Sequence, residues 1–206
     1  MKYVEITQDG AGLVLAKDAE TMGLYTKDVE SCAVYAMWGS EGILMIHDTA
    51  QIKIEDISAL VRKIGKVKRI LFAVNKRLEN HSRKTHNEKR QKLSNITKVK
   101  KMEIVDLPSG MLSIDHLGFE ITKPNYEIYS FPNKEKRLKI MFYNNLFSPT
   151  NSQLVNVDFQ FDGTSFTDLP KLQKNIEEMR KIAMQKAREG DSDFINWLEK
   201  DLNHLT

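Results

Sequence analysis

The sequence predicts an α+β fold, a layered sandwich with a mixed, mainly antiparallel sheet and C-terminal helices. Short segments in which apolar and polar residues alternate occupy most of the first 160 residues, as is typical of strands. One segment with helical spacing interrupts them, and a helical pattern returns only after residue 168. We expect a single α+β domain over residues 1–206, with 168–206 a helical appendage packed on it.

The N-terminal segment predicts two strands and a loop. Residues 2–7 alternate apolar and polar side chains, and residues 12–17 form a second short strand after the turn signal Asp9-Gly10. Residues 18–29 are mixed and polar, so we expect them to form a loop.

A β-hairpin is predicted where the apolar runs 33–38 and 43–46 flank a glycine-containing break. Both faces of this hairpin are largely apolar, which predicts a central pair covered on each side. With Gly39-Ser40 as the turn, Cys32 faces His47 directly across the ladder. With the turn one residue later, His47 faces Val34, and Cys32 becomes its diagonal neighbour on the same face.

The middle of the chain predicts a helix followed by a buried strand. Residues 54–64 carry apolar side chains at helical spacing and end at Gly65, and residues 68–74 form an apolar run. Residues 76–97 are very polar, which leaves a solvated helix or a mobile loop open and predicts that the segment does not pack firmly. Further strands are expected at 101–107, 111–122, 126–131, 137–143 and 154–161, and helices at 168–189 and 191–202.

Composition excludes several classes of protein and site. No run of eighteen apolar residues is present, and the first ten residues lack the apolar stretch of a signal peptide, so a cytoplasmic type of protein is expected. A single cysteine suits a reducing compartment and excludes a cysteine-based zinc site. The sequence contains no HExxH, P-loop or GxGxxG motif, so we expect no metal and no nucleotide cofactor.

Positive charge is concentrated in residues 62–101, which hold fifteen Lys and Arg but two acidic residues. One interpretation is a solvated face. The other is a docking surface for an acidic protein, RNA or anionic lipid, with Arg83, Lys84, Lys89 and Arg90 as the binding residues. The single aromatic residue of the segment belongs to a predicted buried strand, so we expect phosphate contact at most and no stacking of bases.

Cys32 and His47 are the residues that suggest catalysis. A thiol attacks a carbonyl only as a thiolate, and an adjacent histidine can remove its proton. Cysteine and histidine also occur as ordinary core residues, Cys32 as a small apolar side chain and His47 bonded to a backbone carbonyl.

Residues 24–48 resemble the bacterial glutamine deamidases, a group that includes the chemoreceptor deamidase, the catalytic domain of cytotoxic necrotizing factor and Burkholderia lethal factor. Thr26 precedes Cys32 by six positions, Ser31-Cys32 stands at the head of a strand, and His47 follows fifteen positions later. Glu30 departs from the family, which has glycine or another small residue there.

The resemblance implies a cysteine-dependent protein-glutamine deamidase, which converts glutamine to glutamate and releases ammonia. Cys32 would be the nucleophile, His47 the base and Thr26 the residue that orients His47 through its carbonyl or hydroxyl. The backbone N–H groups of Ser31 and Cys32 would hold the oxyanion. Asp48 points to the opposite face of its strand and is a poor orienting group.

The toxin members imply a secreted effector that acts on an exposed glutamine of a host protein, delivered without a cleaved signal peptide. Two alternatives stay open. One is a non-catalytic binding protein that docks on RNA or an acidic partner through residues 62–101, with Cys32 structural. The other is a different cysteine hydrolase, such as a protease.

Overall fold

The computed structural model describes residues 1–50, 52–76, 80–130 and 158–163, and seven single positions between 181 and 200. The chain divides into two compact units. The first comprises Met1–Pro132 with Gln153–Thr167, and the second Asn133–Ser152 with Asp168–Thr206. The expected strand at 137–143 and, apart from the single positions, the expected helices of the appendage 168–206 lie outside the described residues.

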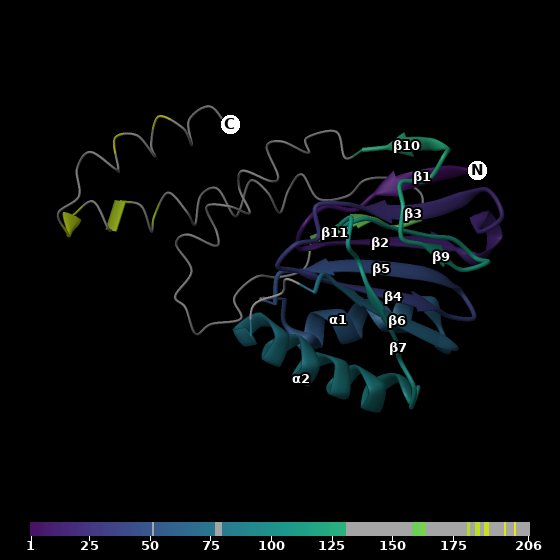
Figure 1. The fold of residues 1–206 in the computed structure, drawn as a ribbon, viewed down its shortest axis with the longest axis horizontal. Coiled ribbons are helices and arrows are strands. Elements are labelled where there is room, and N and C mark those ends of the chain that lie inside the picture. The colour runs from purple at the N-terminus through teal and green to yellow at the C-terminus, as the bar shows by residue number, and fades with distance from the viewer. Residues whose placement is uncertain are drawn as a thin grey trace. The chain divides into compact units, whose positions relative to one another are not determined.

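The first unit is an α+β sandwich of two mixed, mostly antiparallel sheets, as the sequence predicts (Figure 1). Sheet A has the order β10-β1-β3-β8-β9, and sheet B the order β11-β2-β5-β4-β6-β7. The strands of sheet A are β1 (Lys2–Glu5), β3 (Met22–Thr26), β8 (Leu112–Ile114), β9 (Phe119–Glu120) and β10 (Glu127–Tyr129). The strands of sheet B are β2 (Gly10–Leu15), β4 (Ala33–Trp38), β5 (Gly42–Asp48), β6 (Arg69–Val74), β7 (Glu103–Asp106) and β11 (Asp158–Phe161).

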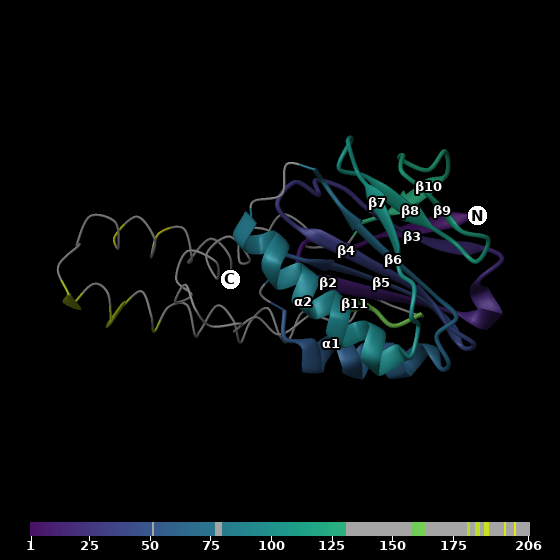
Figure 2. The same ribbon diagram turned by 60° about the horizontal axis from the view of Figure 1, so that its bottom comes forward.

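Helices lie against one face of sheet B (Figure 2). They are α1 (Ile54–Val61), continued by the 3-10 helix η2 (Arg62–Ile64), and α2 (Asn80–Thr97). A further 3-10 helix, η1 (Ala16–Asp18), follows β2. The predicted helix at 54–64 is confirmed, and Gly65 ends it with a positive φ of 68° that favours glycine. None of the helices in the described part of the chain is long and apolar enough to cross a membrane.

The central hairpin β4–β5 separates two apolar cores. Alternate side chains of β4, such as Tyr35 and Met37, pack with the apolar residues of α1. The intervening side chains, such as Val34 and Ala36, pack toward sheet A. Every residue of β4 and β5 is buried, which confirms the prediction of a central, covered pair.

The register of the hairpin is the second of the two that the sequence allows. Val34 pairs with His47, so the direct pairing of Cys32 with His47 is wrong. The cause is the packing of the turn against the end of η2. The N–H of Glu41 donates to the carbonyl of Ile64 at 2.9 Å, and a Cβ at Gly39 would collide with that same carbonyl.

Two other expectations fail because of pairing and packing between distant parts of the chain. Residues 22–26 form β3 and not a loop, because this segment pairs with β1 in parallel and with β8 in antiparallel orientation. Residues 80–97 form a helix that packs firmly on sheet B, since His86, Lys89 and Leu93 are all buried.

The close approach at the turn predicts that Gly39→Ala destabilises the protein. The added methyl group must displace the Ile64 carbonyl, and overpacking of this kind costs about 1–3 kcal/mol. Gly118→Ala is the matched control, because a Cβ there meets only the side chain of Arg69 at 3.7 Å. Urea unfolding measures both variants, and equal stabilities would contradict the steric account.

Candidate functional site

Thr26 and His47 meet across the interface between the two sheets. Thr26 ends β3 in sheet A and His47 lies near the end of β5 in sheet B, and the exposed fractions of the two residues are 0% and 2%. The Oγ1 of Thr26 lies 2.9 Å from Nδ1 of His47. The threonine and histidine that the resemblance groups together are therefore hydrogen-bonded, through the hydroxyl of Thr26.

The hydrogen bonds of Thr26 define the tautomer of His47. The Thr26 hydroxyl donates its one hydrogen to the carbonyl of Ile6 at 2.7 Å. Its oxygen must then accept a hydrogen from Nδ1 of His47, because a hydroxyl has a single donor. In the neutral ring Nε2 consequently carries the lone pair and is the atom that can accept a proton.

Cys32 lies on the same side of sheet B as His47. It comes directly before β4 and two residues before Val34, the partner of His47. Its side chain belongs to the core between the sheets. Diagonal neighbours of this kind are roughly 7 Å apart, so the register brings Cys32 and His47 onto one face without placing them directly opposite each other.

The Cys32 thiol is neutral in this structure. Burial raises its pKa to about 12, and the negative charge of Asp9 adds to the effect, whereas a hydrogen bond from Ser31 opposes it. Only 5% of Cys32 is exposed. Cys32 is therefore a thiol and not a thiolate before substrate binds. A base must remove its proton during the attack.

The segment before Cys32 carries the groups expected to hold an oxyanion. Glu30 and Ser31, which directly precede the buried Cys32 in the chain, are exposed. Val29 is anchored by its N–H, which donates to the carbonyl of Gly110 at 3.0 Å. Asp28 has a positive φ of 59°, which turns the chain between β3 and β4.

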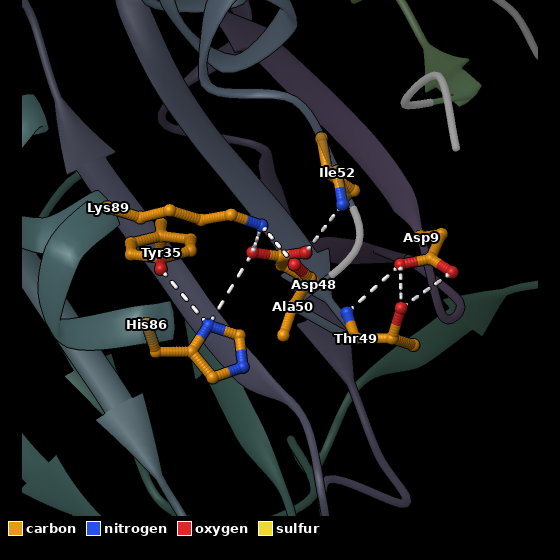
Figure 3. A network of polar contacts seen from close by, with 8 residues as sticks. All are labelled: Asp9, Tyr35, Asp48, Thr49, Ala50, Ile52, His86 and Lys89. Carbon is orange, nitrogen blue, oxygen red and sulfur yellow. Dashed lines mark hydrogen bonds and ion pairs between the residues drawn. The ribbon is translucent and has the colours of Figure 1, made fainter. Parts of the chain in front are cut away.

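Asp48 faces away from the candidate site, as strand alternation predicts. Its carboxylate lies on the helix side of sheet B, where Oδ2 is 2.7 Å from Nζ of Lys89 (Figure 3). Lys89 also donates to the carbonyl of Ala50 at 2.8 Å, and the N–H of Ile52 donates to Oδ1 of Asp48 at 3.1 Å. A buried ion pair thus fixes α2 to the residue that follows His47.

His86 completes this buried network. Its Nδ1 lies 3.2 Å from the hydroxyl of Tyr35 and 3.5 Å from Oδ2 of Asp48 (Figure 3). Burial lowers the pKa of His86 to about 4. The negative charge of Asp48 opposes this shift, and the positive charge of Lys89 adds to it. His86 is therefore neutral at pH 7, and the charge of Asp48 is balanced by Lys89.

The structure corrects one of the four predicted binding residues. Arg83 and Lys84 are exposed, and Arg90 is partly exposed with its guanidinium 5.5 Å from the ring centre of Phe72. Lys89 is 3% exposed and faces inward, so it cannot contact a partner. A signal was present in the sequence, because His86, Lys89 and Leu93 recur on one side of a helix.

Asp9 is a residue that sequence reasoning missed. The sequence indicates only a turn at this position, but the carboxylate is fully buried near the thiol. It accepts hydrogen bonds from the N–H and the hydroxyl of Thr49. Asp9 thereby ties the turn between β1 and β2 to the residues after His47.

No protein-family model matches the chain, and no curated protein matches it significantly. The resemblance to the glutamine deamidases therefore depends on the Thr26, Cys32 and His47 pattern itself.

The buried ion pair predicts a large loss of stability for Lys89→Met. Removing one partner leaves the Asp48 carboxylate buried and uncompensated, which costs about 3–5 kcal/mol. Adding Asp48→Asn should recover part of this loss because it removes the unbalanced charge. Lys92→Met, an exposed position on the same helix, is the control and should change the free energy of unfolding by less than about 0.5 kcal/mol.

His86 predicts a loss of stability in acid. Its folded pKa of about 4 lies below the unfolded value, so the unfolded chain binds more protons between these values. The free energy of unfolding therefore keeps its full value above pH ~6.5. Protonation of His86 lowers it by about 3 kcal/mol in total as the pH falls toward 4. Urea unfolding at pH 7.5 and 4.5 should show a smaller difference for His86→Gln than for the wild type. Exposed His116→Gln should keep the wild-type difference, and equal differences in all three proteins would contradict the assignment.

Proposed function

We propose that this chain is a cysteine-dependent protein-glutamine deamidase. The observation that carries the proposal is the chain of hydrogen bonds from the Ile6 carbonyl through the Thr26 hydroxyl to Nδ1 of His47. This chain prepares Nε2 of His47 as a base on the face of the sheet that holds Cys32.

In the proposed reaction the sulfur of Cys32 attacks the carboxamide carbon of a glutamine side chain while Nε2 of His47 takes the thiol proton. The backbone N–H groups of Ser31 and Cys32 stabilise the oxyanion of the tetrahedral intermediate. The intermediate collapses to a thioester, and the leaving amine takes a proton from His47 and departs as ammonia. Water then attacks the thioester with His47 as base, which releases glutamate and the thiol.

Burial of Cys32 restricts how a substrate can react. Only 5% of Cys32 is exposed, so a glutamine side chain reaches the thiol only when the residues that cover it move. A substrate segment that binds over these residues would supply that movement, and deprotonation would accompany attack. This requirement favours a protein substrate over free glutamine. The resemblance to the toxin members adds the proposal that the substrate is a host protein and the chain a secreted effector.

A second candidate function is a binding protein in which Cys32 is structural. The observation that favours it is the neutral, buried thiol with a pKa of about 12. In that case the cations of residues 62–101, with Lys89 excluded, would carry the function.

The relay between Thr26 and His47 predicts how variants react with a glutamine-like chloromethyl ketone, an electrophile that traps a catalytic thiol. Mass spectrometry of the intact protein should show one adduct in the wild type and none in Cys32→Ala. Thr26→Val should slow the reaction by about tenfold or more, because it removes the hydrogen bond that holds the tautomer of His47. Thr26→Ser keeps the hydroxyl and should react at nearly the wild-type rate.

Circular dichroism and urea unfolding serve as controls for folding of each variant. Equal rates for Thr26→Val and the wild type, with both proteins folded, would remove the catalytic role of the relay. Glutamate formation in a panel of glutamine-rich proteins, read as a mass increase of about 1 Da, is the direct assay of the activity.

A further inference from the structure

Strand β7 forms an edge of sheet B. Within the described ranges it pairs with β6 alone, in parallel orientation (Figure 1). An edge strand presents a row of outward backbone N–H and C=O groups that another strand can bind. Ile104, in the middle of β7, is 58% exposed, so it offers apolar surface beside the strand edge.

A groove of about 280 Å³ lies where β7 approaches α2. Three of its lining residues are the cations Arg90, Lys100 and Lys101, and two are the apolar residues Met102 and Ile104. The other two, glutamine and serine, are neutral, so the lining carries positive charge without a carboxylate. The groove therefore combines apolar surface with a positive field.

The acidic residue in β7 does not cancel this field. Glu103 is paired with Arg69, whose Nη2 lies 2.6 Å from the glutamate Oε2. Strand alternation places Glu103 on the face opposite Ile104. Arg90 is held near the groove by its contact with the ring of Phe72, which pairs with Ile104 in the ladder.

We propose that β7 and this groove bind an extended, acidic segment of a partner protein, which adds a strand to sheet B. Backbone hydrogen bonds to the edge of β7 give the segment its extended form. Alternate residues of a strand point to the same side, so apolar residues can cover Ile104 while acidic residues reach Lys100 and Lys101. The surface lies apart from Cys32 and does not depend on the chemistry of the thiol.

A polypeptide fits the groove better than a nucleic acid does. Single-stranded nucleic acids bind through aromatic side chains that stack on bases, and the lining residues include no aromatic side chain. Exposed Ile104 and a strand edge that no other described strand covers match the side chains and backbone of a peptide, and neither feature matches a phosphate chain.

The test uses the full chain and a labelled ten-residue peptide, with fluorescence anisotropy as the readout. Valine and glutamate follow each other along one face of the peptide strand and serine fills the other face, so both kinds of side chain point toward the groove. The peptide should bind, and Lys100→Glu combined with Lys101→Glu should weaken binding at least tenfold. Lys17→Glu combined with Lys123→Glu makes the same change in net charge at exposed positions outside the groove and should weaken binding less than threefold.

Two peptides with N-methyl groups at alternate positions test strand addition without changing the protein. Methyl groups on the residues that bond to β7 should abolish binding, and methyl groups shifted by one residue should leave it nearly unchanged. The proposal would be overturned if the two N-methylation patterns weakened peptide binding equally. It would also be overturned if the Lys100/Lys101 and Lys17/Lys123 double variants did so. Binding of a single-stranded RNA of equal charge in place of the peptide would overturn it in favour of a phosphate site.

Discussion

The pairing of β4 with β5, with Val34 opposite His47, is the constraint on which the rest of the structure depends. This hairpin lies at the centre of sheet B, so its alternation decides which residues enter each of the two cores. His47 and Asp48 are neighbours in the chain, yet one reaches Thr26 in sheet A and the other reaches Lys89 in α2. A shift of one residue would exchange the two faces and remove both contacts.

The buried ion pair makes α2 part of the same unit as the candidate site. A helix with so few apolar residues contributes little hydrophobic surface, and Lys89 and His86 occupy positions that apolar side chains usually fill. The charges of Lys89 and Asp48 compensate each other, and the carbonyl of Ala50 and the N–H of Ile52 provide further hydrogen bonds. Burial of both charges carries a desolvation cost, so the ion pair adds less net stability than its short distance suggests.

Burial favours the neutral form of two titratable groups, Cys32 in the candidate site and His86 in the network around Asp48. The pKa of the Cys32 thiol is raised and that of the His86 imidazole is lowered, and burial is the largest cause in each case. For the proposed chemistry this means that His47 acts as a base during attack, since no thiolate is stored beforehand. For the fold it means that the network around Asp48 contains one positive and one negative charge at neutral pH.

The resemblance to the glutamine deamidases suggested the grouping of Thr26 with His47. The sequence by itself determined the α+β class, the helix beginning at Ile54, the central hairpin and the direction of Asp48 away from His47. These features follow from local periodicity and from the alternation of a strand, which a short stretch of residues contains completely. Tertiary structure decided the hairpin register, the strand at residues 22–26, the burial of Lys89 and the neutral state of Cys32. Each of these depends on residues far away in the chain: the Ile64 carbonyl beside Gly39, the strands that flank β3, the carboxylate that meets Lys89, and the apolar core around the thiol.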